Sequence, residues 1–161
     1  MLITTLNNIK KCKPCDSGWK MLLNHLGKKR ADDEPLPFLT ILESNGFDDA
    51  LWCTWSAPEY DKEWRLFGVW CVRKVQNLLI DPRSLDALDV SERFANGLAS
   101  QDELSMAWAA ARDAASYAAS SEAWDAAWAA ARDAASSAAW AAARNASRDA
   151  QKAQFIKIIT K

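Results

Sequence analysis

The amino-acid sequence predicts an all-α protein, and three observations support that prediction. All five glycines and all five prolines lie at or before Gly97, so the rest of the chain lacks the two strongest helix breakers. Between Ala107 and Ala150, 23 of 44 residues are alanine, the residue with the highest helix propensity. The alternating apolar pattern typical of strands is nearly missing. We therefore expect a compact multi-helix bundle or a short α-solenoid-like array, with long Ala-rich C-terminal helices.

The length of the chain predicts one domain. A chain of 161 residues is close to the modal domain size of about 100–150 residues. We expect residues 1–161 to form a single all-helical domain. Within it, residues 1–97 should form short punctuated helices, and residues 98–161 should form Ala-rich repeat helices.

Glycines and prolines mark the ends of the predicted short helices. Several of the predicted helices also begin at a residue that can cap them. The predicted elements are Thr5–Cys12; a helix from an Asp16 cap to Gly27; Phe38–Ser44 after Pro37; a stretch capped by Asp48 or Asp49 and ending before Pro58; a helix from about Glu59 to Leu79, opened by a capping box of Ser56 and Glu59; a helix from a Ser84 cap to Asn96-Gly97; and a capping box of Ser100 and Glu103 before the Ala-rich part.

Three copies of a Trp-Ala-Ala-Ala-Arg unit begin at Trp108, Trp128 and Trp140. On one continuous helix the first two indoles would point about 160° apart, and the last two about 120° apart. Three such indoles cannot share one buried stripe, so either the segment breaks or one helix is surrounded on all sides. We expect a break at Ser120-Ser121 and leave a second break at Ser136-Ser137 open. Because alanine buries little apolar area, we expect the nine tryptophans to supply much of the core.

Tryptophan and arginine stand four residues apart in each copy, which places them one above the other on a helix. One interpretation is structural: a cation–π pair and ion pairs between helices. A second is a protein interface, since Trp and Arg are common anchors of binding energy. A third is a nucleotide pocket in which the indole stacks on a base and the guanidinium holds a phosphate. The candidate partner- or ligand-binding residues are Trp108, Arg112, Trp128, Arg132, Trp140 and Arg144.

The cysteines do not predict a metal or redox site. Cys12 and Cys15 have CxxC spacing, but no strand precedes them as a thioredoxin-like motif requires. Cys53 and Cys71 lack the second CxxC spacing that a zinc site would use. We expect reduced thiols, no metal and no cofactor.

No catalytic constellation stands out either, so we expect a protein that is not an enzyme. His25 is the only histidine and lies near a predicted helix end, where a cationic ring favours the helix dipole. Glu59, Asp61 and Glu63 bring carboxylates together, but acids are common in the first turn of a helix. Neither phosphate-binding glycine motif is present.

Charge and hydropathy restrict the partners and the compartment. The 20 basic and 21 acidic residues nearly cancel, so we expect no nucleic-acid partner. The N-terminus has no signal-peptide pattern, and no uncharged stretch approaches the roughly 20 residues of a membrane span. We expect a cytoplasmic protein, and large Ala-rich faces favour a homo-oligomer.

The chain resembles a family of phage and bacterial immunity proteins rich in Ala and Trp. The resemblance runs in order along nearly the whole chain. The residues that carry it are Cys15-Asp-Ser-Gly-Trp19, Gly46 followed by Asp49, Leu51-Trp52, Asp81-Pro-Arg83, the AWAAARDAA repeats and Asp149-Ala-Gln-Lys-Ala-Gln-Phe155. The resemblance implies a helical fold and a neutralising role in toxin immunity or against host defence, and it supplies no catalytic residues.

Together these observations predict a non-catalytic binding protein, phage-encoded, that acts in the host cytoplasm. It would block or sequester a protein target, either a host-defence component or a toxin. The alternative is a sponge that sequesters a nucleotide immune signal in a Trp/Arg-lined pocket.

Overall fold

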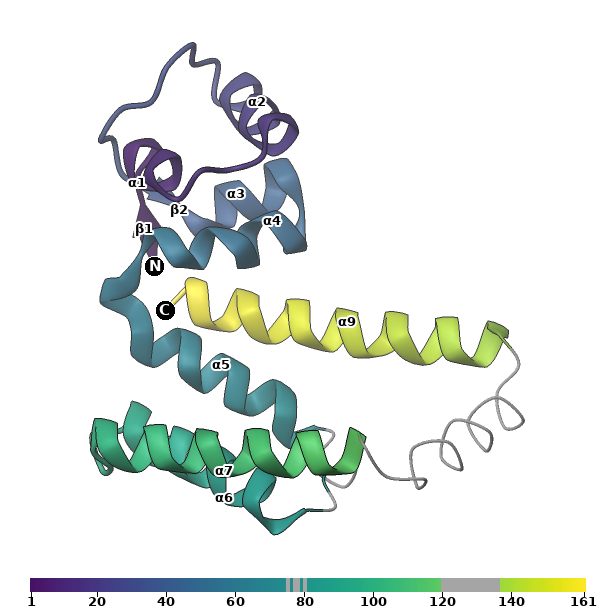
Figure 1. The fold of residues 1–161 in the computed structure, drawn as a ribbon. Helices are drawn as coiled ribbons and strands as arrows, with labels where there is room; N and C mark the ends of the chain where they lie inside the picture. The colour runs from purple at the N-terminus through teal and green to yellow at the C-terminus, as the bar shows by residue number, and fades with distance from the viewer. Residues whose placement is uncertain (75, 77–78, 80, 120–136) are drawn as a thin grey trace. The chain divides into compact units, whose positions relative to one another are not determined.

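The computed structural model describes residues 1–74, 76, 79, 81–119 and 137–161. Its secondary structure is mainly α-helical, which confirms the all-α prediction (Figure 1). The chain divides into two compact units, one of Met1–Trp64 with Lys152–Lys161 and one of Arg65–Gln151. Gly97, where the composition changes, lies inside the second unit. In the described part of the chain, no helix is both long and apolar enough to span a membrane.

The first unit contains short helices and one small pair of strands. The strands are antiparallel, with Ile3 opposite Pro37 and Thr4 opposite Leu36, an element that the sequence did not predict. The elements of this unit are β1 (Ile3–Thr4), α1 (Leu6–Lys11), α2 (Asp16–His25), β2 (Leu36–Pro37), α3 (Phe38–Asn45), α4 (Phe47–Trp52), the 3-10 turns η1 (Cys53–Ser56) and η2 (Pro58–Tyr60), the start of α5 (Asp61–Arg73) and the end of α9 (Ser137–Ile159).

The helices α1, α2 and α4 begin close to the expected residues, but the caps of α2 and α4 differ from those expected. Thr5 caps α1 by accepting a hydrogen bond from the Asn8 backbone N–H at 3.1 Å. The cap of α2 is Cys15 rather than Asp16, because Cys15 has the extended backbone and its Sγ accepts from the Gly18 N–H. Gly46, with φ +85°, precedes α4, so its two aspartates lie in the first turn instead of capping it.

The predicted capping box at Ser56 is wrong. Its hydroxyl donates to the Cys53 carbonyl at 2.6 Å and lies 2.8 Å from the Thr4 hydroxyl, so it holds η1 against β1. Two 3-10 turns therefore precede α5, which runs from Asp61 to Arg73 rather than to Leu79.

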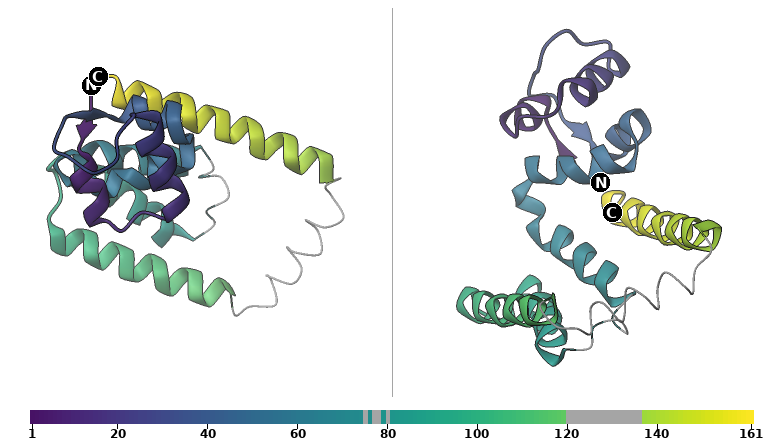
Figure 2. Two further views of the ribbon diagram at one scale, coloured as in Figure 1. Left: turned by 90° about the horizontal axis from the view of Figure 1, so that it is seen from above. Right: turned by 45° about the vertical axis from the view of Figure 1, so that its right-hand side comes forward.

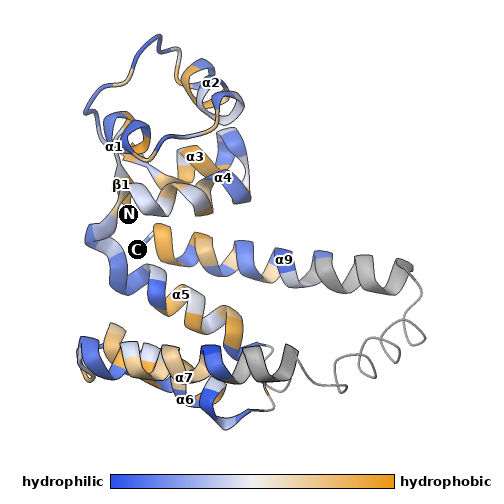
Figure 3. Cartoon of the chain, viewed as in Figure 1, coloured by the Kyte–Doolittle hydropathy of each residue, from blue (hydrophilic) through white to orange (hydrophobic). Residues whose placement is uncertain are grey.

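The core of the first unit joins the two ends of the chain. Phe155 near the end of α9 is fully buried, stacks on Trp64 at 6.0 Å and meets Phe47 edge-on at 5.5 Å. The Leu2 N–H donates to the Ile159 carbonyl at 2.8 Å, and Figure 2 shows the two termini side by side. Figure 3 shows the apolar residues that α3 and the last turns of α9 contribute.

The second unit is built around the pair α6 (Pro82–Ala95) and α7 (Gln101–Ala119). Their contact is made by small and aliphatic side chains, with Leu104 almost fully buried. Asp81 rather than Ser84 caps α6, since Pro82 occupies the first helical position. The predicted capping box of α7 is confirmed, with Glu103 N–H to Ser100 Oγ at 3.2 Å and Ser100 N–H to Glu103 Oε2 at 2.7 Å. The break predicted at Ser120-Ser121 lies outside the described residues.

Among the side chains that the structure describes, tryptophan contributes less to the core than the sequence predicted. Among the described side chains, the large fully buried ones are phenylalanines, leucines and isoleucines. Trp64 packs partly inside, but Trp52 is 37% exposed, Trp108 48% and Trp55 77%. Several indoles therefore remain available on the surface.

Candidate functional site

Only the first Trp/Arg pair predicted from the repeats is described at side-chain level. Trp108 lies on α7, where its Nε1 donates to the Ser91 hydroxyl at 3.1 Å. The guanidinium over its ring is that of Arg65, at 5.9 Å, and Arg65 also lies 5.0 Å from the centre of the Phe94 ring. Arg112 is exposed one turn further along α7. Trp128 and Arg132 lie outside the described residues, and Trp140 and Arg144 lie in α9 with their side chains undescribed.

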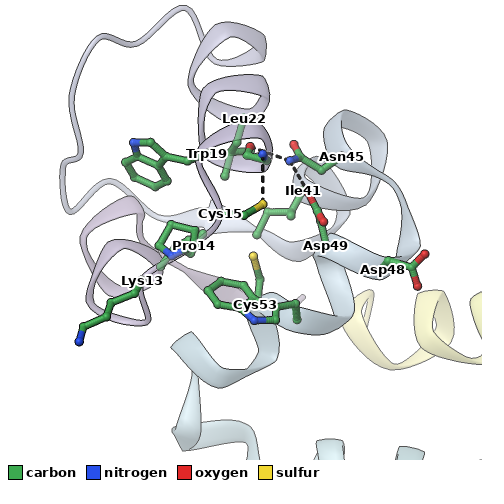
Figure 4. A pocket seen from close by; sticks show the side chains of 13 residues that line it. Lys13, Pro14, Cys15, Trp19, Leu22, Ile41, Asn45, Asp48, Asp49 and Cys53 are labelled. Atoms are coloured by element: carbon green, nitrogen blue, oxygen red, sulfur yellow. Dashed lines mark hydrogen bonds between the residues drawn. The ribbon is translucent and has the colours of Figure 1, made fainter.

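A pocket that the sequence did not predict lies in the first unit (Figure 4). Its volume is about 500 Å³, within the range of roughly 300–1,000 Å³ that small-molecule sites occupy. Its walls are formed by α1, the loop residues before α2, the helices α2, α3 and α4, and the start of η1. The lining residues are Ile9, Lys13, Pro14, Cys15, Gly18, Trp19, Leu22, Ile41, Asn45, Asp48, Asp49, Trp52 and Cys53.

One wall of the pocket is a polar cluster that ties three helices together. The Asn45 side-chain amide, at the end of α3, donates to the Gly18 carbonyl in α2 and to Asp49 Oδ2 in α4, both at 2.8 Å. Ser44 Oγ donates to Asn45 Oδ1 at 2.6 Å and fixes that amide. The Gly18 N–H donates to Cys15 Sγ at 3.4 Å. Figure 4 marks with dashed lines the bonds of Asn45 to Gly18 and Asp49 and the bond of Gly18 to Cys15.

This close approach favours glycine at position 18. A Cβ added there would lie 2.6 Å from Asp49 Oδ2 and 3.2 Å from Cys15 Sγ. The first distance is shorter than a carbon–oxygen contact allows, so any larger residue would push the carboxylate away. The sequence around Gly18 thus sets how near Asp49 and Cys15 come to each other.

The two pocket thiols have opposite ionisation behaviour. Hydrogen bonds from the Ser17 hydroxyl and the Gly18 backbone lower the pKa of Cys15 below its ordinary value, and this thiol is exposed. Burial, followed by the nearby charge of Asp49, raises the pKa of Cys53 to about 12. Cys15 is therefore the more nucleophilic of the two. Among the side chains that the structure describes, no three metal-type ligands come together.

The pocket is suited to binding a mostly apolar group with one polar end. Its apolar lining comes from Ile9, Leu22, Ile41 and two indoles, and its polar end is the cluster around Asp49. No arginine is among the lining residues, the Lys13 side chain is directed outward in Figure 4, and the carboxylate of Asp49 opposes an anion. A phosphate group therefore does not match this pocket.

Sequence reasoning singled out the pocket residues without recognising a site. Cys15, Gly18, Trp19, Asp49 and Trp52 are among the residues that carry the resemblance, and the structure places all five in the pocket lining. Cys15 otherwise stood out only for its CxxC spacing, and Asp49 only as a helix cap. The signal that could have indicated a site is the combination of Gly18 with Trp19 and of Gly46 with Asp49, in two segments about 30 residues apart. The spacing alone did not reveal that α3 brings these segments together.

No family model, curated protein sequence or solved structure matches this chain.

Proposed function

We propose that this chain is a non-catalytic binding protein that blocks or sequesters a protein target in the cytoplasm. The class of target is a host-defence component or a toxin, and the protein would be phage-encoded. The observation that supports this most directly is the position of Trp52 and Trp55. Trp52 lines the pocket, and Trp55, one turn further along the chain, is the most exposed indole among the described residues, at 77%.

Exposed indoles beside a pocket have the character of a protein-binding surface. Tryptophan is enriched among residues that dominate binding energy, and such residues cluster around well-formed pockets. A large apolar ring in water forgoes the stabilisation that burial would give, at about 25 cal/mol per Å². Contact with a partner would recover that stabilisation. The indoles of the first unit therefore form the favoured interface.

The polar groups of the pocket favour binding over turnover. The donors of Asn45 and Gly18 are already engaged by protein acceptors. Cys15 is the candidate nucleophile, but His25 is not among the lining residues, so no imidazole base faces its thiol. A wall that satisfies its own hydrogen bonds is rigid, which suits recognition of a fixed shape.

The test is capture of partners from bacterial lysate by tagged protein, with mass spectrometry of the captured proteins. Three proteins are compared: the wild type, a Trp52→Ala/Trp55→Ala variant and a Trp108→Ala variant. Trp108 is the matched control because it is a half-exposed indole on the other unit. We expect a stoichiometric partner that the first variant loses and the control keeps. Loss of the partner only in Trp108→Ala would contradict this assignment, as would capture of no protein by the wild type.

A nucleotide sponge is the second candidate, and one observation favours it. Trp108 is half exposed, and Arg112, also exposed, follows it by one helical turn, so a base and a phosphate could meet both. Isothermal titration with linear and cyclic nucleotides tests it. Heat of binding that Arg112→Gln reduces supports the sponge, and no heat with any nucleotide refutes it.

A further inference from the structure

We propose that the pocket in the first unit receives a basic side chain, lysine or arginine, of the target protein. The cation would lie at Asp49, and the aliphatic part of the side chain would pack against Trp19 and Leu22. This inference rests on the proposed function, because it names the group by which the target is held. It follows from the hydrogen-bonding capacity, the charge and the apolar lining of the pocket.

The polar wall offers acceptors and has no donors left to give. Both hydrogens of the Asn45 amide are used, one by the Gly18 carbonyl and one by Asp49 Oδ2. The Gly18 N–H is used by Cys15 Sγ. A carboxylate only accepts hydrogen bonds and can take several of them. Within the described part of the chain, Asn45 is the one hydrogen-bond donor recorded at Asp49, so a ligand that meets this wall must bring donors.

The charge at the centre of the pocket is negative. No cation among the described residues lies within salt-bridge distance of Asp49. Figure 4 shows the Lys13 side chain directed outward, away from Asp49, and the Asp48 carboxylate also directed away from the other labelled side chains. The N-terminal end of α2 contributes a positive partial charge, but its Gly18 N–H is aimed at Cys15 Sγ rather than at the cavity. A ligand cation is therefore the complement of this site.

The rest of the pocket fits the body of a basic side chain. Lysine and arginine carry three or four methylene groups, which pack well along apolar surface while the charge stays near a polar group. The lining supplies that surface from Leu22, Ile41 and the indoles of Trp19 and Trp52. Indole faces also attract cations through their π electrons. One ligand group thus satisfies both halves of the pocket.

The test uses short capped peptides of the form acetyl-Ala-X-Ala-amide. In one pair X is lysine or norleucine, and in the other X is arginine or citrulline, so each pair keeps the shape of the side chain and removes the charge. A glutamate peptide serves as the anionic control. Binding is followed by the NMR shifts of the Gly18 backbone amide and the Asn45 side-chain amide, with tryptophan fluorescence as a second readout.

We expect the charged member of each pair to bind roughly tenfold or more tightly than its neutral analogue, as is typical of hydrogen bonds to charged groups. Asp49→Asn, which keeps size and shape, should remove that difference. Glu43→Gln is the matched control, because Glu43 is an exposed carboxylate on α3 that does not line the pocket. It should bind the peptides as the wild type does.

Equal binding within each pair would overturn the inference, and so would preference for glutamate or the absence of any shift. If Asp49→Asn fails to fold, the affinities of the wild type for the charged and neutral peptides of each pair still test the inference. The proposed function fails separately. A captured protein partner that persists in Asp49→Asn supports the function and refutes the basic side chain. Selective binding of basic peptides without any captured protein supports the pocket chemistry and refutes the function.

Discussion

Asn45 donates a hydrogen bond to Asp49 Oδ2 at 2.8 Å while its second amide hydrogen reaches the Gly18 carbonyl at the same distance. This single side chain joins α2, α3 and α4 and sets the orientation of the pocket carboxylate. Replacing it by alanine leaves the Gly18 carbonyl and the carboxylate without their donor. We expect Asn45→Ala to lower the free energy of unfolding by about 1–3 kcal/mol. Urea denaturation measures this, and an unchanged midpoint would show that the amide does not support the wall.

Gly18→Ala should damage the pocket by steric overlap. The added Cβ would lie 2.6 Å from Asp49 Oδ2, so the carboxylate or α2 must move, at a cost of about 1–3 kcal/mol. Gly68→Ala is the matched control, because nothing lies within 4 Å of its added Cβ and it is inside α5. That control should stabilise the protein by roughly 0.5–1 kcal/mol through helix propensity. Thermal unfolding of both variants measures their changes in stability. Equal changes in the two variants would argue against the close approach at Gly18.

The pocket cysteines should differ in their reaction with iodoacetamide. The Ser17 hydroxyl and the Gly18 amide lower the pKa of Cys15, so at a given pH near 8 more of it is thiolate than in an ordinary cysteine. Burial raises the pKa of Cys53 to about 12, so it stays protonated throughout that range. Peptide mapping over a pH series should show Cys15 alkylated first, with its half-point shifted to higher pH in Ser17→Ala. Earlier reaction of Cys53, or no effect of Ser17→Ala, would contradict these ionisation states.

Phe155 should be a main support of the first unit although it lies at the far end of the sequence. Its ring is fully buried and contacts Phe47 and Trp64. Phe155→Ala should cost about 3–5 kcal/mol, the range for removing a buried aromatic ring. Trp55→Ala, which removes a ring of similar size from the surface, should change stability by less than about 0.5 kcal/mol. Circular dichroism during thermal unfolding compares them, and similar losses would mean that the last turns of α9 do not pack in this unit.

Local signals predicted much of the helical structure. The start of α1 near Thr5, the end of α3 at Asn45, the end of α6 near Gly97 and the capping box of Ser100 with Glu103 all depend on residues close in sequence. The expected cap Asp16 is wrong by one position, since the extended backbone and the accepting side chain belong to Cys15. The expected cap Ser84 lies three residues after the actual cap, Asp81, because Pro82 already occupies the first helical position.

Features that depend on distant segments were missed. The Ser56 hydroxyl is held by Thr4, 52 residues away, so it could not act as the predicted cap. The pocket forms because Asn45 of α3 holds α2 and α4 close together. The spacing of residues along the sequence does not indicate that these helices are neighbours. The sequence also favoured the Trp/Arg repeats as the site, because a repeat is visible in the sequence itself. A pocket is formed by segments that are distant in sequence, so it becomes visible only in the structure. Arg65 over the Trp108 ring, 43 positions away, shows how an indole can take a cation from outside its own repeat.

Photo-crosslinking inside bacterial cells tests the central claim most directly. A photoreactive p-benzoylphenylalanine is placed at Trp55, beside the pocket, and in a separate protein at Trp108 on the second unit. The proposed function predicts a discrete crosslinked protein from position 55, with no such product from position 108. A crosslinked protein only from position 108, or none from either position, would contradict the account of the first unit as the binding surface.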